Sequence, residues 1–294
     1  MTANLIDGSV ISRQIRDELA TEVAKLKSDY GITPGLATVL LGDDPASKVY
    51  IGQKERAAQS LGIYSERYDL PEATSEAELL KLIERLNREP KIHGVLVQLP
   101  LPRHINEGKV IFAINPRKDA DGFHPTNLGK LMIGEPEFIP CTPAGIHELL
   151  IRSGTKIDGA EVVIVGRSNI VSKPIASILI QKKEHANATV TLCHTGTRDL
   201  AFHTRRADIL IVAAGHPKTV TADMVKEGVV VIDVGVNRIG ENAQGKAILV
   251  GDVDFEGVKE KAKAITPVPG GVGPMTVTML MVNTVKAAKL ARGL

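Results

Sequence analysis

Hydrophobic positions in the first half of the chain alternate between helical spacing and continuous apolar runs. Between residues 9 and 28 the apolar residues recur at helical spacing and define one face of an expected helix. The run at residues 35–42 is apolar almost throughout, which is typical of a strand buried on both faces of a parallel sheet. Expected strands cover residues 35–42, 62–70 and 92–102, and expected helices cover 9–28, 47–62 and 76–89. This order predicts a βαβαβ unit.

Residues 115–145 interrupt the alternation because they are rich in proline, glycine and asparagine. So long an irregular connection is usually functional or marks a domain boundary, which we place near Pro140. A second alternation follows, with a hairpin-like stretch before its last strand. Its expected strands cover residues 160–168, 188–194, 207–215, 228–236 and 264–269, and its main expected helices cover 172–184, 254–262 and 275–294. Five apolar strands separated by helices predict a doubly wound parallel sheet.

The expected fold is therefore two α/β domains with a cleft between them, the second domain being Rossmann-like. Residues 1–139 form the first expected domain and residues 140–273 the second. The last helix, within residues 274–294, is expected to pack back on the first domain. A chain of 294 residues is long enough to bury two such cores.

Composition argues against several classes of function. The net charge is +2, tryptophan is absent and only five phenylalanines occur, so neither a basic face nor stacking aromatics indicate nucleic-acid binding. The apolar runs are too short to cross a membrane, and the first residues lack the profile of a signal peptide. Cys141 and Cys193 show no paired spacing, which favours a reduced, cytoplasmic protein over a disulfide scaffold.

The segment VVIVGRSNIVSKPIAS contains an expected strand, a turn at Gly166 and the start of an expected helix. In a dinucleotide-binding fold, N–H groups at such a helix N-terminus hold the pyrophosphate. The usual Gly-x-Gly-x-x-Gly pattern is interrupted by Arg167, Ser168 and Ser172, so a purely structural turn is about as common an explanation. Its place after the first strand of the five-strand unit favours a cofactor site.

The end of the second strand in that unit predicts which dinucleotide binds. NAD-binding domains place an acid there for the ribose 2′-hydroxyl, whereas a 2′-phosphate calls for cationic or neutral donors. Four such donors precede the first acid: His194, Thr195, Thr197 and Arg198. Arg167 adds a fork-shaped phosphate donor. NADP is therefore favoured over NAD, while polar loop residues without a cofactor role remain the simpler interpretation.

In the first half, Tyr50 and Lys54 lie four positions apart on an otherwise apolar helical face. Short-chain dehydrogenases use a Tyr-x-x-x-Lys pair, but after their nucleotide turn, whereas here the pair precedes Gly166 by more than one hundred residues. A core tyrosine with a snorkelling lysine is the simpler interpretation. Gln98, near the end of an apolar strand, and Asp121, in a glycine-bounded loop, weaken it because they add polar groups to the same half.

Eight stretches of the chain together carry a resemblance to a known family. They are SKVYIGQK, GVLVQLPLP, KDADGFHPTNLG, PCTPAG, VVIVGRSNIVSKP, VIDVGVNR, GDVDF and PVPGGVGPMTVTML. In this combination and order the chain resembles the bifunctional methylenetetrahydrofolate dehydrogenase/methenyltetrahydrofolate cyclohydrolase family over essentially its whole length. The resemblance implies oxidation of 5,10-methylenetetrahydrofolate with NADP, hydrolysis of the methenyl product to 10-formyltetrahydrofolate, and assembly as a homodimer.

The resemblance also implies roles for individual residues. Lys54 is the implied central catalytic group, Gln98 supports it and Asp121 binds the pterin ring. The implied catalytic residues are Tyr50, Lys54, Gln98 and Asp121. The implied folate-binding residues are Tyr50, Lys54, Val97, Gln98, Leu99, Asp121, Pro269, Gly270 and Gly271. The implied NADP-binding residues are Gly166, Arg167, Ser168, Thr195 and Ile232.

The implied chemistry suits these residue types. The methenyl substrate is an electrophilic cation, so its hydrolysis needs a positioned water and proton transfer. A lysine with hydrogen-bond partners such as Gln98 and Tyr50 can relay protons. The eight histidines show no metal-binding spacing, and no metal site is expected.

One position departs from the family pattern G-R-S-x-x-V-G-x-P, because Ser172 replaces the second glycine. A serine there either loosens the cofactor fit or donates its own hydroxyl at the helix N-terminus. Two alternatives to the bifunctional enzyme therefore stay open. One is a cyclohydrolase with weakened dehydrogenase activity, and the other is a non-catalytic NADP- or folate-binding regulator.

Overall fold

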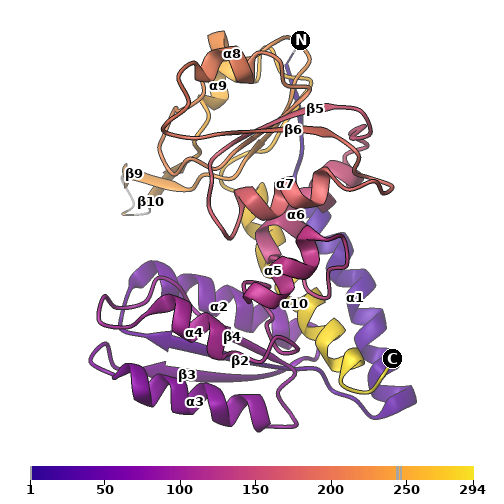
Figure 1. Cartoon of the computed structure of the whole chain (residues 1–294), viewed down its shortest axis with the longest axis vertical. Coiled ribbons are helices and arrows are strands. Elements are labelled where there is room, and N and C mark those ends of the chain that lie inside the picture. The colour runs from indigo at the N-terminus through magenta and orange to yellow at the C-terminus, as the bar shows by residue number, and fades with distance from the viewer. Residues whose placement is uncertain (1, 243–244, 246) are drawn as a thin grey trace. The chain divides into compact units, whose positions relative to one another are not determined.

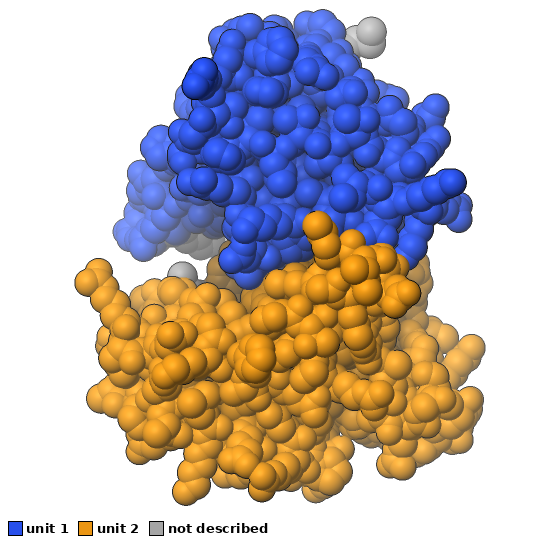
Figure 2. All heavy atoms as spheres, viewed as in Figure 1, with its two compact units in different colours: residues 1–13, 142–276 blue, residues 14–141, 277–294 orange. Residues whose placement is uncertain are grey.

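The computed structural model describes residues 2–242, 245 and 247–294. Its contacts divide the chain into two compact units (Figure 2). Unit 1 holds the segment ending at Arg13 and residues 142–276, and unit 2 holds residues 14–141 and 277–294. Each boundary falls within a helix. These helices are α1 (Gly8–Tyr30), α6 (Cys141–Arg152) and α10 (Val272–Leu290).

Unit 2 is built on a three-stranded parallel sheet in the order β3-β2-β4, which confirms the predicted βαβαβ unit. Its elements are β2 (Gly35–Leu41), α2 (Pro45–Ser60), β3 (Tyr64–Leu70), α3 (Glu76–Arg88), β4 (Gly94–Val97), α4 (Glu107–Ala113) and α5 (Pro125–Met132). Leu36 of β2 packs with Ala58 of α2, whereas Val39 of β2 packs with Ile83 of α3. The two helices therefore cover opposite faces of the sheet (Figure 1), as right-handed crossovers require.

Two long helices, α1 and α10, pack with α2 in the core of unit 2. The expected apolar face of α1 is buried at every position, namely Ile11, Ile15, Leu19, Val23 and Leu26. Leu280 and Met281 of α10 pack in the same cluster as Leu19 and as Leu36 of β2. The last helix thus returns, from residue 277 onward, to the unit that holds the first half of the chain.

Unit 1 contains a six-stranded parallel sheet in the order β1-β11-β8-β7-β5-β6. Its elements are β1 (Asn4–Leu5), β5 (Glu161–Val165), α7 (Ser172–Leu179), β6 (Thr189–Cys193), α8 (Leu200–Thr204), β7 (Ile209–Val212), the 3₁₀ turn η1 (Ala222–Met224), β8 (Val230–Asp233), β9 (Asn237–Glu241), β10 (Ala247–Val250), α9 (Phe255–Val258) and β11 (Ala264–Ile265). Figure 1 shows α6 and α7 on one side of this sheet and α8 and α9 on the other. This is the predicted doubly wound, Rossmann-like fold.

The strand order of unit 1 reverses beside β5, because β6 lies on one side of it and β7 on the other. In doubly wound sheets, ligands bind at such a switch point, outside the carboxyl ends of the strands. The sheet also gains a strand that the sequence pattern did not predict. β1 pairs with β11, which places the N-terminal segment in unit 1 rather than with residues 14–139.

Several elements differ from the sequence expectation. The helix expected at 172–184 ends at Leu179, and the one expected at 254–262 covers only Phe255–Val258. Conversely, α5 lies in the segment expected to be irregular. It begins with Pro125 after the N-cap residue His124, whose Nδ1 accepts a hydrogen bond from the Thr126 N–H. A capping residue followed by proline is a local signal for the start of a helix, but it lies here in a segment rich in glycine and proline.

The hairpin-like stretch is the antiparallel pair β9 and β10. Residues 243, 244 and 246 lie outside the described residues.

Candidate active site

Lys54 and Gln98 form a directed pair in unit 2. Lys54 lies on α2 with only 8% of its surface exposed, on the face that also buries Ala57 and Leu61. Its Nζ donates a 2.9 Å hydrogen bond to Gln98 Oε1. Gln98 follows β4, and its Nε2 donates a 2.7 Å hydrogen bond to the Leu99 carbonyl. The hydrogen bond of Nε2 to Leu99 thus orients the Gln98 side chain so that its oxygen faces Lys54 Nζ.

The carboxylate of Asp121 interacts electrostatically with the Lys54 ammonium. Burial raises the pKa of Asp121 to about 6, the Lys54 ammonium opposes this rise, and the neighbouring Asp119 carboxylate adds to it. Asp121 also lines one small hollow together with Val97, Leu99 and Phe123. Three residues that the resemblance implies for folate binding, Val97, Leu99 and Asp121, thus line the same hollow. A fourth implied residue, Lys54, lowers the pKa of the Asp121 carboxyl in it.

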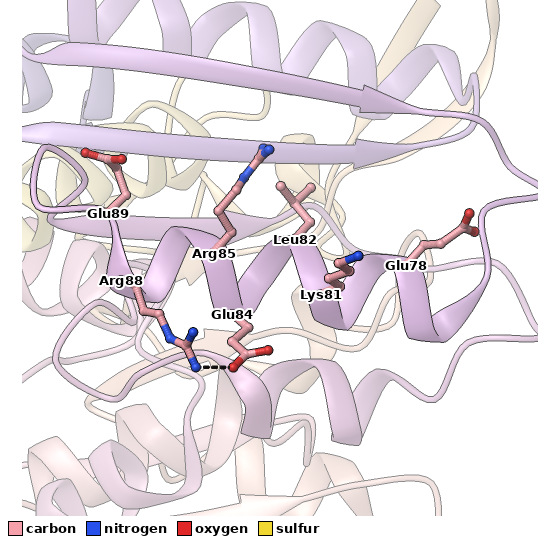
Figure 3. Close-up of a pocket in the computed structure, with 7 residues that line it drawn as sticks. All are labelled: Glu78, Lys81, Leu82, Glu84, Arg85, Arg88 and Glu89. Atoms are coloured by element: carbon pink, nitrogen blue, oxygen red, sulfur yellow. Dashed lines mark hydrogen bonds and ion pairs between the residues drawn. The ribbon is translucent and has the colours of Figure 1, made fainter.

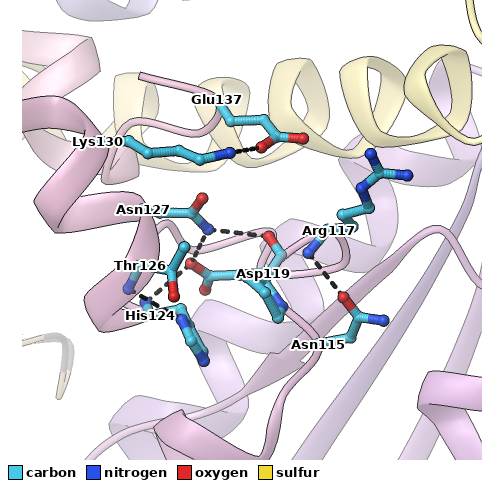
Figure 4. Close-up of polar contacts among 9 residues, drawn as sticks. Asn115, Arg117, Asp119, His124, Thr126, Asn127, Lys130 and Glu137 are labelled. Atoms are coloured by element: carbon cyan, nitrogen blue, oxygen red, sulfur yellow. Dashed lines mark hydrogen bonds and ion pairs between the residues drawn. The ribbon is translucent and has the colours of Figure 1, made fainter. Parts of the chain in front are cut away.

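The loop that carries Asp121 is organised by Asp119 (Figure 4). The buried Asp119 carboxylate accepts backbone N–H groups from Phe123 at 3.1 Å and His124 at 2.8 Å, and the Asn127 side-chain amide at 2.7 Å. Burial raises the pKa of Asp119, and these hydrogen bonds oppose that rise. The sequence reasoning gave Asp119 no role. The available signal was the pair of aspartates two positions apart in KDADG.

Further contacts fix the backbone on both sides of Asp121. Asn283 of α10 donates 2.9 Å hydrogen bonds to the carbonyls of Ala120 and Ile139. Gly122 has φ +76°, and a Cβ there would lie 2.6 Å from Pro140 N, so the turn requires glycine. The Cys141 N–H donates to the Asp121 carbonyl at 3.2 Å. Asp121 is therefore presented from a rigid loop.

Tyr50 lies one helical turn before Lys54 and is the exposed member of the pair, with 38% of its surface accessible. The interpretation as a core tyrosine with a snorkelling surface lysine is wrong, because the lysine is the buried residue and the tyrosine the exposed one.

The turn after β5 in unit 1 is shaped around Gly166. This residue has φ +141°, and a Cβ on it would lie 2.4 Å from the Ala213 carbonyl oxygen and 2.6 Å from Ser172 Oγ. Its N–H donates a 2.8 Å hydrogen bond to the Cys193 carbonyl. Only glycine fits there, because the Ala213 carbonyl and the Ser172 hydroxyl already occupy the space that a Cβ would need.

Two serines shape the start of α7. Ser168 Oγ accepts hydrogen bonds from the N–H groups of Val171 at 3.0 Å and Ser172 at 3.3 Å. The Ser172 side chain is completely buried, and its hydroxyl has no hydrogen-bond partner among the described residues. The N-terminus of α7 suits a phosphate group, because helix N-termini present backbone N–H donors to anions.

Arg167 follows β5 and Thr195 follows the neighbouring strand β6, and their side chains are in contact. Arg167 Nη2 donates a 3.3 Å hydrogen bond to Thr195 Oγ1, and both residues are exposed. Two of the five donors predicted for a 2′-phosphate, Arg167 and Thr195, are thus adjacent. Ile232 differs, because the whole residue is buried in β8.

Pro269, Gly270 and Gly271 belong to unit 1, where they form a tight turn before α10. Gly270 has φ +107°, and its carbonyl accepts a 3.1 Å hydrogen bond from the Ser9 N–H. A Cβ on Gly271 would lie 2.6 Å from the Pro267 carbonyl oxygen, so this turn also depends on glycine.

A surface groove along α3 is a further hollow, but its chemistry is that of a solvated helix face (Figure 3). It is lined by Glu78, Lys81, Leu82, Glu84, Arg85, Arg88 and Glu89. Charges of both signs are interspersed there, and Glu84 pairs with Arg88. Such a groove lacks the apolar lining with a few convergent polar groups that is typical of ligand sites.

Among the described residues, no group of three or more His, Cys, Asp or Glu side chains could hold a metal ion. No helix within the same residues is long and apolar enough to span a membrane.

The chain therefore combines a Rossmann-like unit, which has a glycine-dependent turn after β5, with a second α/β unit that contains the buried Lys54–Gln98 pair. The chain belongs to the tetrahydrofolate dehydrogenase/cyclohydrolase family. The family's catalytic domain matches residues 6–121, and its NAD(P)-binding domain matches residues 140–292. The family resemblance predicted from the sequence motifs is therefore confirmed.

Individual relatives agree over the full chain. The bifunctional protein FolD of Syntrophus aciditrophicus (strain SB) is 65% identical over 294 residues, covering 100% of both chains. The crystal structure of the bifunctional enzyme FolD from Campylobacter jejuni is 48% identical, with a TM-score of 0.92 over 98% of this chain and 99% of that chain. The Trypanosoma brucei FolD structure, complexed with NADP cofactor and inhibitor, is 39% identical, with a TM-score of 0.94 over 100% of both chains.

Proposed function

We propose that this protein is a bifunctional enzyme of one-carbon metabolism. It oxidises 5,10-methylenetetrahydrofolate to 5,10-methenyltetrahydrofolate with NADP and hydrolyses that product to 10-formyltetrahydrofolate. The observation that carries the proposal is the 2.9 Å hydrogen bond from the buried Lys54 ammonium to Gln98. A protein that only binds folate has no use for a buried ammonium, which is costly to desolvate. Family membership supports the same reactions.

Lys54 is proposed to move protons in the hydrolytic step. Water adds to the methenyl carbon between N5 and N10 of the folate and loses one proton, which leaves a hydroxyl group on that carbon. N5 then gains a proton, its bond to this carbon breaks, and the hydroxyl loses its proton to become the formyl carbonyl on N10, so that one proton is released overall. Lys54, held by Gln98, can accept the first proton in its neutral amine form and return it to N5 from the resulting ammonium.

Asp121 is proposed to bind the pterin ring. The ring presents an N–H and an amino group, and an ionised carboxylate is the matching acceptor. With a pKa of about 6, Asp121 is mostly ionised at neutral pH. Further residues proposed to contact the folate are Tyr50, Val97, Leu99, Pro269, Gly270 and Gly271.

The NADP site is proposed to lie at the switch point of unit 1. When bound, NADP supplies the hydride acceptor. Gly166 and Ser168 shape the turn for the pyrophosphate, and Arg167 with Thr195 holds the 2′-phosphate. Ile232 is proposed to contribute backbone contacts only. Residues 140–273 thus form the proposed NADP domain, and residues 1–139 with the helix in 274–294 form the proposed folate domain, except that residues 2–13 lie in unit 1.

An assay that follows NADPH formation and methenyl-folate decay in the same sample tests the function. Both signals are expected from the purified protein. Hydrolysis without NADPH formation would instead indicate a cyclohydrolase with a weakened dehydrogenase. Binding of either ligand without turnover would indicate a regulator and would overturn the proposal.

A homodimer in the cytoplasm is the proposed state. Exposed apolar side chains at and beside the β9–β10 hairpin, Val236, Ile239 and Ile248, support self-association through unit 1. Cys141 and Cys193 are free and buried, which suits a reducing compartment. Sedimentation at the mass of two chains is expected, and the variant Ile239→Lys should shift it toward one chain. A wild-type protein that sediments as a single chain would contradict the dimer.

A further inference from the structure

Two buried carboxylates in unit 1 have no role in the function proposed above. Asp233, 2% exposed, is the last residue of β8, and Asp252, 0% exposed, follows β10. Asp252 Oδ2 accepts the backbone N–H groups of Ala214 at 2.6 Å and Gly215 at 2.7 Å. Its Oδ1 accepts the side-chain amide of Asn237 at 2.8 Å. One carboxylate therefore holds two consecutive N–H groups of a single loop.

Asp233 in turn holds the backbone of Asp252. Its Oδ1 accepts the N–H groups of Gly235 at 3.0 Å and Asp252 at 2.9 Å, and its Oδ2 accepts that of Val253 at 3.0 Å. Burial and the nearby Asp252 raise the pKa of Asp233 to about 6, while these N–H donors oppose the rise. Both carboxylates have hydrogen-bond partners on each oxygen, so they form a completed network.

Glycines make room for this network. A Cβ on Gly251 would lie 1.8 Å from Asp233 Oδ2, and a Cβ on Gly235 would lie 2.1 Å from Asp252 Oδ1. The motifs VIDVGVNR and GDVDF thus pack against each other. Asp233 of the first motif occupies the space beside Gly251 of the second, and Asp252 of the second occupies the space beside Gly235 of the first.

The loop that Asp252 holds lies at the switch point of the sheet. Ala213 N donates a 2.7 Å hydrogen bond to the Val165 carbonyl, and a Cβ on Gly166 would lie 2.4 Å from the Ala213 carbonyl oxygen. The loop therefore abuts the phosphate turn. Ala214 and Gly215 are exposed and carry no functional side chain, so this stretch offers a ligand only its backbone and its shape.

We propose that Asp252 is a positioning residue for the nicotinamide half of the cofactor, acting through the backbone of Ala214 and Gly215, and that Asp233 keeps Asp252 in place. The inference rests on the proposed NADP site. Arg167 and Thr195 lie on the β5–β6 side and fit the adenosine half with its 2′-phosphate. A dinucleotide spans the switch point, so its other half lies over β7 and β8. Asp252 keeps the loop there in one conformation, in which Gly215 has φ +72°.

The test compares two ligands on the variant Asp252→Asn. NADP occupies both halves of the site, whereas adenosine 2′,5′-bisphosphate occupies only the adenosine half. We expect the variant to bind NADP about tenfold more weakly, as for one lost charge-assisted hydrogen bond, and to bind the bisphosphate within about twofold of wild type. Dehydrogenase activity should fall with NADP affinity, while hydrolysis of methenyl-folate, which uses no NADP, should stay within about twofold.

Asp208→Asn is the matched control. Asp208 precedes β7 at the opposite, amino end of that strand, and its Oδ2 accepts the Glu161 N–H at 2.9 Å. This variant removes the charge of a carboxylate that contacts a backbone N–H and Lys226 away from the crevice, and no change in either affinity is expected.

Two results would overturn the inference. Equal losses for NADP and the bisphosphate would mean that Asp252 only stabilises unit 1, and an unchanged NADP affinity would mean that the loop is not positioned by it. Should Asp252→Asn not fold, Asn237→Ala removes one donor to Asp252 and should give a smaller loss confined to NADP, and the same two results would overturn it. Failure of the wild-type protein to bind NADP would refute the proposed function itself, before any variant is made.

Discussion

Lys54 Nζ and Gln98 Oε1 lie 2.9 Å apart, although 44 positions separate the two residues in the chain. The contact exists because α2 packs on the face of the sheet that contains Leu36, and the end of β4 lies beside β2 in that sheet. A helix and a strand of the same βαβαβ unit thus deliver the two groups to one point. Such sites on regular elements hold catalytic geometry better than sites on loops.

Replacing Lys54 with methionine tests its role as the proton-transfer group. Lys54→Met keeps much of the stem volume and removes the head group, so the packing of α2 should survive. Cyclohydrolase activity should fall by a factor of about 10²–10⁴, the usual contribution of a general acid–base group. Dehydrogenase activity should fall less, and methenyl-folate should accumulate in a coupled assay. A folded variant that hydrolyses methenyl-folate at the normal rate would make Lys54 a scaffold residue.

Replacing Asp121 with asparagine should separate stability from function. The pKa of Asp121 rises from 3.8 to about 6 in the folded protein, so ionisation of this group costs stability as the pH rises from about 4 to about 6. Asp121→Asn should therefore raise the melting temperature by about 2–4 °C at neutral pH and by much less near pH 4, while weakening folate binding.

Asp43→Asn is the control for this experiment, because the Asp43 side chain is 92% exposed. It should leave both the melting temperature and folate binding unchanged. If Asp121→Asn raises the melting temperature equally at both pH values, the titration of Asp121 is not the cause of that rise.

Arg167→Ala should change the choice of cofactor. The guanidinium lies beside Thr195, and its removal should weaken NADP binding by about 1.5–3 kcal/mol, as for a hydrogen bond to a charged group. NAD lacks the 2′-phosphate, so its affinity should change little. Dissociation constants for both cofactors provide the measurement, and equal losses would show that Arg167 does not contact that phosphate.

Ser172→Ala should reveal what the unpartnered hydroxyl does. Removing a buried hydroxyl without a partner should stabilise the ligand-free protein by about 1 kcal/mol. If a cofactor phosphate is the missing partner, NADP affinity should fall about threefold to tenfold. Melting curves with and without NADP measure both effects. Tighter NADP binding in the variant would instead show that the serine hydroxyl obstructs the turn.

Periodicity and local signals made much of the fold predictable. The apolar face of α1, the buried strands and the doubly wound order of unit 1 all follow from spacings within short windows. Some short elements were not predicted. β1 has two residues and α5 has eight, too few for a periodic pattern to stand out.

The sequence by itself determined the residue types of the candidate site and their family, because the motifs around Lys54, Gln98, Asp121 and Gly166 are local and specific. Only the tertiary structure decided that Lys54 is buried and bonded to Gln98, that Asp119 organises the loop of Asp121, and that β1 closes the edge of unit 1. It also decided that Asp233 and Asp252 form one network. The physical reason is that burial, pKa shifts and hydrogen bonds between distant segments depend on packing, which no local pattern encodes.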